Sequence, residues 1–222
     1  MLFEKEKVKL SERERQMRAM EREQAVVLGS RFKLLFIIHV ASVAASFTSY
    51  VATYLEAGFG VIAVISGISL AMSILFAVIL FMLGKYNGEF TMAGLTFIMA
   101  QIATFCQSIS PSGVSMMFSI MAAALSVGYV IKFTSGMEAC VTHADGYLAE
   151  SWEKFRNYFI YVTIFTVCCT VLVFFPGILK VLAAIGILLA AIVALILSVW
   201  QIVLLYRSGN TMTAFSQTPI DG

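Results

Sequence analysis

Residues 181–206 read VLAAIGILLAAIVALILSVWQIVLLY, and none of them is Asp, Glu, Lys or Arg. About twenty consecutive apolar residues are enough to cross the hydrocarbon core of a bilayer as a helix. The stretch therefore predicts a membrane-spanning helix, which Arg207 closes at the lipid surface.

The composition of the whole chain agrees with this prediction. Of its 222 residues, 60% are hydrophobic and only 13% are charged, whereas soluble domains carry roughly 25% charged residues. A water-soluble core could not hide this much apolar surface, so the lipid bilayer is the expected surrounding of the chain. The net charge of +2 gives no basic patch of the kind that nucleic acid requires, and we expect no nucleic-acid partner.

Five further apolar runs precede residues 181–206. They cover residues 34–54, 61–83, 90–109, 114–131 and 158–175. We therefore predict an all-α integral membrane protein whose transmembrane domain, residues 32–207, is a compact bundle of six helices paired as three hairpins. Gln101 and Gln107 lower the hydropathy of the third run. A four-span arrangement with a re-entrant segment over residues 90–133 is therefore the alternative.

The N-terminal segment, residues 1–31, is charged and is expected to form a cytoplasmic helix. Ser11 opens a capping box, which predicts a helix start near Glu12. Gly29–Ser30 is typical of a helix stop, here before the membrane. About thirty mostly polar residues precede the first apolar run, so we expect no cleavable signal peptide. At the other end of the chain, residues 208–222 form a short polar tail.

The longest polar connection, residues 133–157, lies between the fourth and fifth apolar runs. Its apolar residues recur at intervals of three and four, which is the period of an amphipathic helix; they are Val141, Ala144, Leu148, Trp152 and Phe155. We predict a cytoplasmic interfacial helix that lies on the membrane surface. It is broken at Asp145–Gly146, and Asp145 caps the segment that begins near Tyr147.

The placement of charge predicts the orientation. Cytoplasmic loops of membrane proteins carry an excess of Lys and Arg. With six spans and a cytoplasmic N-terminus, all Lys and Arg residues fall on the cytoplasmic side except Lys180. We therefore predict a multi-pass protein of the cell membrane with both termini in the cytoplasm.

Small residues spaced four apart line several predicted spans. Gly67 and Ala71 do so in the second span, and Gly186 and Ala190 do so in the sixth. Such stripes let helix backbones approach closely. We expect them to pack the bundle and to offer a face for a homo-oligomer.

Polar side chains inside the predicted spans gather on the first three helices. Gln101, Thr104 and Ser108 share one face of the third helix. His39 lies inside the first span, with Ser42 on the same face and Gln101 as a candidate partner. The candidate residues of a polar path are His39, Ser66, Ser69, Ser73, Gln101, Thr104 and Ser108. The alternative is that these groups only form hydrogen bonds that pack neighbouring helices.

No catalytic, cofactor or metal motif accompanies these features. No Asp, Glu, Lys or Arg lies deep inside a predicted span, and the sequence contains no nucleotide-binding or zinc-protease motif. Cys140 and His143 have the spacing of zinc ligands, but no second pair follows them. We therefore expect neither enzymatic activity nor a bound cofactor or metal.

Two functions are consistent with these predictions. The first is a non-catalytic scaffold or accessory subunit that docks a protein partner or a second copy on its cytoplasmic face. Its candidate docking residues are Arg18, Arg22, Trp152 and Phe155. The alternative is a channel or facilitator for a small neutral solute through the polar faces of the second and third spans. A membrane-embedded enzyme has no motif to support it.

Overall fold

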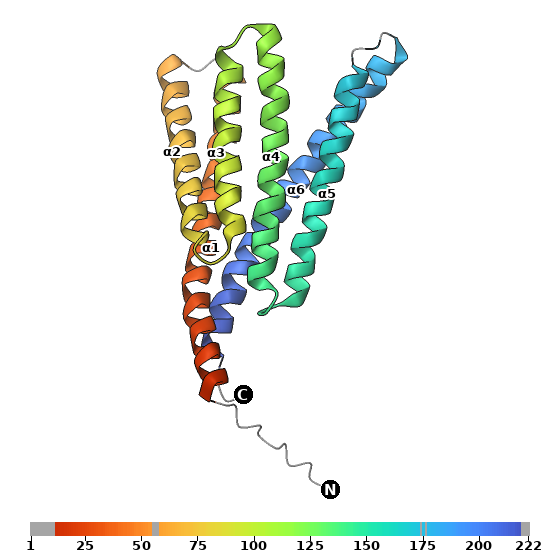
Figure 1. Cartoon of the computed structure of the whole chain (residues 1–222). Coiled ribbons are helices and arrows are strands. Elements are labelled where there is room, and N and C mark those ends of the chain that lie inside the picture. Colours follow the sequence, from red (N-terminus) through yellow and green to blue (C-terminus); the bar gives the residue numbers. More distant parts are fainter. Residues whose placement is uncertain (1–11, 55–57, 174, 176, 219–222) are drawn as a thin grey trace.

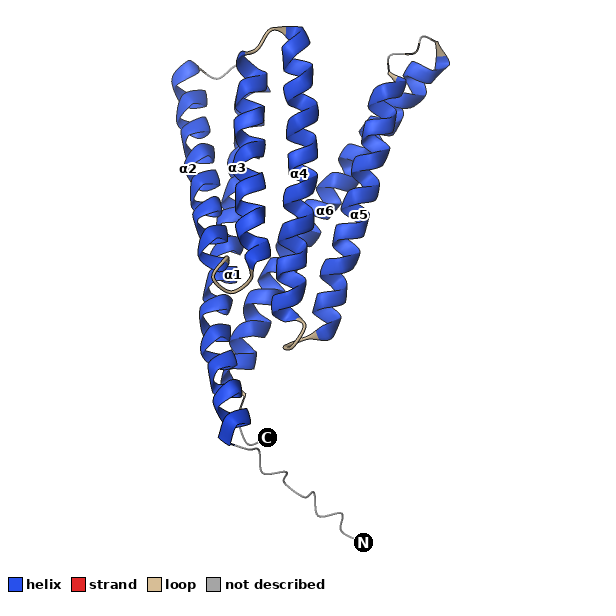
Figure 2. Ribbon diagram, in the orientation of Figure 1, coloured by secondary structure: helices blue, strands red, loops and turns tan. Residues whose placement is uncertain are grey.

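The computed structural model describes residues 12–218, apart from 55–57, 174 and 176, and its described residues form six α-helices and no strand (Figures 1 and 2). The helices are α1 (Glu12–Tyr54), α2 (Phe59–Leu83), α3 (Gly88–Ile109), α4 (Ser112–Val141), α5 (Gly146–Leu172) and α6 (Ile178–Gln217). Each of the six contains a segment long and apolar enough to cross a membrane. The prediction of an all-helical fold with six helices long and apolar enough to cross a membrane is therefore confirmed. Ser11, the predicted capping residue, lies outside the described residues.

Two helices are longer than the sequence predicted. The predicted stop at Gly29–Ser30 is wrong, because α1 runs through it without interruption. Likewise α6 continues beyond Arg207 to Gln217, so most of the predicted polar tail is helical. Both extensions lie side by side, and the contact between α1 and α6 explains why each stays helical outside the apolar segment.

The close approach of α1 and α6 depends on two glycines. A Cβ atom built on Gly29 would lie 2.9 Å from Thr213 Oγ1 and 3.1 Å from the Thr213 nitrogen. A Cβ atom on Gly209 would lie 2.8 Å from Lys33 Cγ. Glycine therefore serves here as a packing residue within two helices and not as a helix terminator.

The predicted interfacial connection over residues 133–157 is divided differently in the structure. Its first part continues α4 to Val141, its last part begins α5 at Gly146, and only the short turn between them is not helical. Asp145 is the N-cap of α5, where its carboxylate accepts a hydrogen bond from the Leu148 nitrogen at 3.0 Å. The predicted break and cap are thus confirmed, but the described residues contain no separate helix lying between the spans.

The six helices form a ring in chain order. Each helix contacts the next one along the chain, and α1 contacts α6 to close the ring. We call the end where Figure 1 marks both termini the terminal end, and the opposite end the far end. Helices α2, α3 and α4 stay together along their length, whereas the α5–α6 pair leans away from them toward the far end (Figure 1).

The dense core lies in the half of the bundle nearer to the terminal end. Its large side chains are completely or almost completely buried; they include Phe32, Leu35, Leu80, Leu83, Phe90, Phe133, Met137, Leu148, Trp152, Phe155, Leu204 and Leu205. Toward the far end, apolar side chains such as Phe105, Met117 and Leu188 are exposed. Lipid is the natural covering for such side chains on the outside of the bundle.

Candidate solute-binding site

A cavity of about 160 Å³ lies inside the ring, above the dense core. Five of the six helices contribute to it; its lining residues are His39 and Ser42 of α1, Met72, Ser73 and Phe76 of α2, Phe97 and Gln101 of α3, Tyr129 of α4 and Gln201 of α6. At a rise of 1.5 Å per residue, His39 lies roughly 22 Å from the far end of α1. The cavity therefore lies deep within the apolar part of the bundle.

Five of the nine lining residues are His, Gln or Ser. His39, Gln101 and Gln201 bring an imidazole and two amides from three different helices, and Ser42 and Ser73 add hydroxyl groups. His39 Nε2 is buried and has no hydrogen-bond partner among the described residues. A buried polar atom without a partner costs free energy, and a bound solute or water molecule in the cavity would remove this cost.

The remaining lining residues are largely aromatic, and their rings contact one another and His39. The Phe76 ring centre lies 5.3 Å from that of Phe97 and 6.2 Å from that of His39, and Phe97 lies 5.3 Å from Tyr129. The Tyr129 side chain lies against that of Gln201. The cavity thus presents both hydrogen-bonding groups and flat apolar faces. None of its lining residues is Asp, Glu, Lys or Arg.

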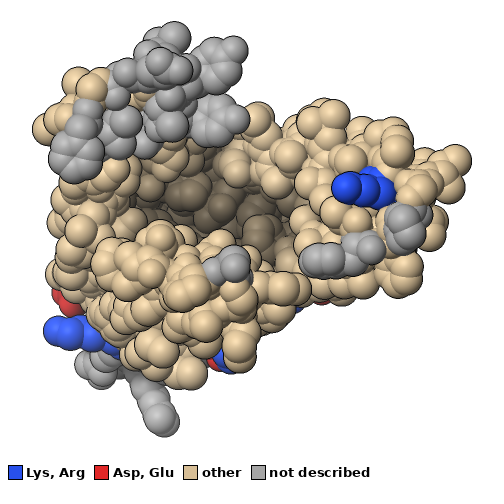
Figure 3. Space-filling model, turned by 90° about the horizontal axis from the view of Figure 1, so that it is seen from above, with Lys and Arg blue, Asp and Glu red and all other residues tan. Residues whose placement is uncertain are grey.

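The far end of the protein is hollowed. Figure 3, which views the bundle from this end, shows a deep hollow in the middle of the face; the described residues that line it are tan, and a Lys or Arg side chain lies farther out on the same face. The hollow follows from the fold, because α5 and α6 lean away from α4 at this end (Figure 1).

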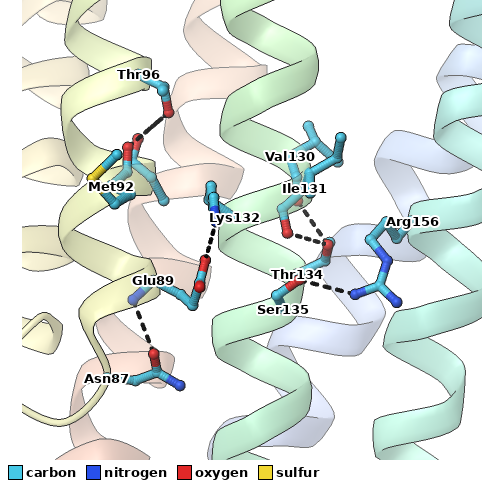
Figure 4. A network of polar contacts seen from close by, with 11 residues as sticks. Asn87, Glu89, Met92, Thr96, Val130, Ile131, Lys132, Thr134, Ser135 and Arg156 are labelled. Atoms are coloured by element: carbon cyan, nitrogen blue, oxygen red, sulfur yellow. Dashed lines mark hydrogen bonds and ion pairs between the residues drawn. The ribbon is translucent and has the colours of Figure 1, made fainter.

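The terminal end is held together by polar contacts between neighbouring helices. Arg31 of α1 donates a hydrogen bond to the Met82 carbonyl oxygen of α2, and its guanidinium lies 5.4 Å from the centre of the Tyr86 ring. Lys132 Nζ of α4 lies 3.0 Å from Glu89 Oε2 of α3. Figure 4 shows this ion pair beside the Asn87 cap of α3.

Two further contacts join α5 to its neighbours. Arg156 Nη1 lies 2.9 Å from Glu138 Oε2. It also donates a hydrogen bond to Ser135 Oγ at 3.0 Å, which Figure 4 shows. Trp152 Nε1 donates to Ser208 Oγ of α6 at 3.0 Å. The terminal end is therefore both densely packed and cross-linked, whereas the cavity faces the more open half of the bundle.

The structure brings together some of the candidate path residues and separates others. His39, Ser73 and Gln101 line the cavity, and Ser42 joins them. Ser66 is exposed, and Ser69 is half-buried outside the cavity lining. Two others bond to their own helix: the Thr104 hydroxyl donates to the Ala100 oxygen, and the Ser108 hydroxyl donates to the Phe105 oxygen. Both bonds stay within α3, so these two hydroxyl groups neither line the cavity nor form the predicted hydrogen bonds to a neighbouring helix.

Two cavity residues with hydrogen-bonding side chains were missed by the sequence-based prediction. Gln201 is the one amide in the most apolar span, and this isolation was a usable signal. Tyr129 lies near the end of the fourth apolar run, and the structure places it in the cavity lining. The sequence gives no sign that these two side chains meet, because they lie on helices far apart in the chain.

Two of the candidate docking residues lie in the core. Trp152 is 0% and Phe155 is 1% exposed. The amphipathic stripe that suggested a membrane-surface helix therefore faces the neighbouring helices of the protein. Arg22 is half-buried on α1, and Arg18 lies on the same helix. Among the described residues, no group of His, Cys, Asp and Glu is arranged to hold a metal ion, and Cys140 and His143 remain a lone pair.

Comparison with protein-family models, with curated proteins and with solved structures finds no match to this chain.

Proposed function

We propose that this protein binds a small neutral solute in the cavity at His39 and facilitates its passage across the membrane. The proposal rests on one observation: polar side chains from α1, α2, α3 and α6 converge on a cavity with no charged lining residue. Charged groups are costly inside a membrane. A neutral solute needs no countercharge in the protein, and the uncharged lining suits it.

The chemistry of the lining narrows the class of solute. The imidazole, amides and hydroxyls of the lining can both donate and accept hydrogen bonds, so they suit a solute with both kinds of group. The rings of Phe76, Phe97 and Tyr129 suit a flat or apolar face of the solute. A volume of about 160 Å³ equals roughly five water molecules at 30 Å³ each. Small amides, ureas and polyols meet these requirements.

The proposed orientation places the far end outside the cytoplasm. The terminal end carries Arg31, Lys33, Lys85, Lys132 and Arg156 on α1 to α5. An excess of Lys and Arg favours the cytoplasmic side, so both termini lie in the cytoplasm and the cavity is reached from outside. We propose the cell membrane as the location, with Gly67 and Ala71 as a candidate face for a second copy, because both are exposed on α2.

Solute-driven swelling of proteoliposomes tests the proposed function. The purified full chain is reconstituted, and the swelling rates in formamide, urea and glycerol are compared with those of protein-free vesicles. We expect faster swelling with at least one of these solutes and a return toward the protein-free rate for Gln101→Leu. Gln107→Leu is the matched control, because Gln107 lies on the same helix but not in the cavity lining.

The result that overturns the proposal is a swelling rate equal to that of protein-free vesicles for all three solutes. Equal rates for Gln101→Leu and Gln107→Leu would also overturn it, since the cavity would then not be the route. Either result would favour the alternative function, a non-catalytic scaffold that docks a partner on its cytoplasmic face. Its remaining support is the α1 extension with Arg18 and Arg22, because Trp152 and Phe155 are not accessible to a partner.

A further inference from the structure

A second cavity, of about 240 Å³, lies at the terminal end. It is lined by α1, the α2–α3 turn, the end of α4 and the end of α6. Leu28, Tyr86, Cys140 and Met212 contribute one residue from each of these segments. Glu21, Asn87 and His143 add polar groups to its wall. This cavity lies on the opposite side of the dense core from the cavity at His39.

The two cavities lie on one line through the bundle. Three helices contribute a residue to each of them; the pairs are Leu28 and His39 on α1, Tyr129 and Cys140 on α4, and Gln201 and Met212 on α6. The members of each pair are eleven positions apart, by subtraction of their residue numbers. At 3.6 residues per turn, eleven positions are about three turns, so both members point from the same face of their helix. The cavities are therefore stacked roughly 16 Å apart, at 1.5 Å per residue.

A continuous plug of apolar side chains separates the cavities. Its members are all 0% exposed. Phe32 and Leu35 of α1, Phe133 and Met137 of α4, and Leu205 of α6 lie between the paired residues of their helices, and Phe90 of α3 lies between Asn87 and Phe97. The Phe133 ring centre lies 6.2 Å from that of Phe90 and 5.6 Å from that of Tyr129, which lines the cavity at His39. Phe90 in turn lies 6.3 Å from Phe32.

We propose that the two cavities are the outer and inner binding sites of a single solute path, and that this plug is its closed gate. The inference rests on the proposed function and assigns the second cavity to the same class of small hydrogen-bonding solute. The cavity at His39 faces the more open half of the bundle, toward the far end. The plug lies in the half toward the terminal end, where polar contacts join neighbouring helices. The structure is thus open to the far side and closed to the terminal side.

Phe133→Ala tests the gate. Phe133 contacts Tyr129 at the cavity of His39 and Phe90 within the plug, and Phe133→Ala removes the Phe133 ring from the plug. We expect proteoliposomes with this variant to swell roughly tenfold faster in urea than wild-type ones, which corresponds to a barrier lower by about 1.4 kcal/mol. Phe155→Ala is the control. Phe155 is equally buried but packs between Trp152 and Trp200, outside the plug, so its truncation should leave the rate unchanged.

Each outcome separates the gate from the proposed function. If wild type is no faster than protein-free vesicles but Phe133→Ala is faster and Phe155→Ala is not, the path exists and transport by the wild type is refuted. If wild type conducts urea and Phe133→Ala equals Phe155→Ala, the gate is refuted and the proposed function stands. Phe133→Leu and Met137→Ala are tested in parallel, because smaller truncations of the same plug fold more readily; unchanged swelling in these folded variants would likewise overturn the gate.

Discussion

The Trp152 indole nitrogen and the Ser208 hydroxyl are joined by a buried hydrogen bond of 3.0 Å between α5 and α6. Both residues are 0% exposed. The Ser208 hydroxyl also donates to the Leu204 carbonyl oxygen of its own helix at 2.8 Å, so both of its roles, acceptor and donor, are used. This bond fixes the two helices at the level of the dense core, below the point where they lean away from α4.

Ser208→Ala should destabilise the protein by roughly 0.6–1.7 kcal/mol, the range found for hydrogen bonds between membrane helices. The indole N–H would lose its partner and remain buried. Thermal unfolding in detergent, followed by size-exclusion, measures the effect. Ser198→Ala is the matched control, since its hydroxyl donates only to the Ala194 oxygen of the same helix.

A double-mutant cycle with Trp152→Phe isolates the bond itself. We expect the two substitutions together to cost less than the sum of each alone, because either one already removes the hydrogen bond. Strict additivity would show that the contact contributes nothing to stability.

Gly209→Ala should destabilise the α1–α6 pair by about 1–3 kcal/mol, the usual cost of adding a methyl group to a tightly packed contact. The new Cβ atom would lie 2.8 Å from Lys33 Cγ and 3.2 Å from the Lys33 nitrogen. Gly67→Ala is the control, because no atom lies within 4 Å of its added Cβ. That variant should gain up to about 1 kcal/mol from helix propensity. Melting temperatures that move in the same direction for both would contradict this packing.

Glu138→Gln should lower stability by about 1 kcal/mol, the upper range for an ion pair near the surface. Its partner Arg156 is only 20% exposed in its side chain and is also held by Ser135. Glu150→Gln should have almost no effect, because the Lys154–Glu150 pair is 55% and 53% exposed. Melting temperatures at low and high salt check both statements. A larger loss of stability for Glu150→Gln than for Glu138→Gln would show that the exposed Lys154–Glu150 pair is the stronger one.

His39→Gln and His39→Leu should show whether His39 serves solute passage through its hydrogen bonds or only through its bulk. Glutamine keeps a donor and an acceptor in the cavity lining, whereas leucine keeps only bulk. Since Nε2 has no protein partner, His39→Leu should preserve or raise stability while abolishing the faster swelling. His39→Gln should retain part of that swelling. A strong loss of stability in His39→Leu would instead indicate a structural histidine.

The number of spans was predictable from the sequence because lipid imposes a length and an apolar composition on every crossing helix. The Asp145 cap was predictable as well, since it depends on residues close in the chain. The predicted helix stop at Gly29 was wrong because Gly29 packs against the segment of α6 around Gly209, which lies far along the sequence. The stripe through Trp152 and Phe155 was found, but its period does not tell whether lipid or protein covers it.

The cavity was predictable only in part for the same reason. Helical spacing placed His39 and Ser42 on one face, but spacing within a helix does not show which helices meet. Gln201 and Tyr129 joined the site only through the contacts of α6 and α4 with the other helices.

The most direct test of the central claim is the reactivity of a cysteine at position 73 in the reconstituted protein. Ser73→Cys is made with Ser in place of Cys106, Cys140, Cys168 and Cys169, and is treated with a charged, membrane-impermeant methanethiosulfonate reagent. Such reagents need an ionised thiol in contact with water.

A hydrated cavity predicts modification of Cys at position 73, and protection when a conducted solute is present. Leu70→Cys in the same background is the control, because Leu70 is 62% exposed on the outside of α2, where lipid covers it. It should not react. If the cysteine at position 73 is as unreactive as that at position 70, the cavity is dry and the account of a solute path is contradicted.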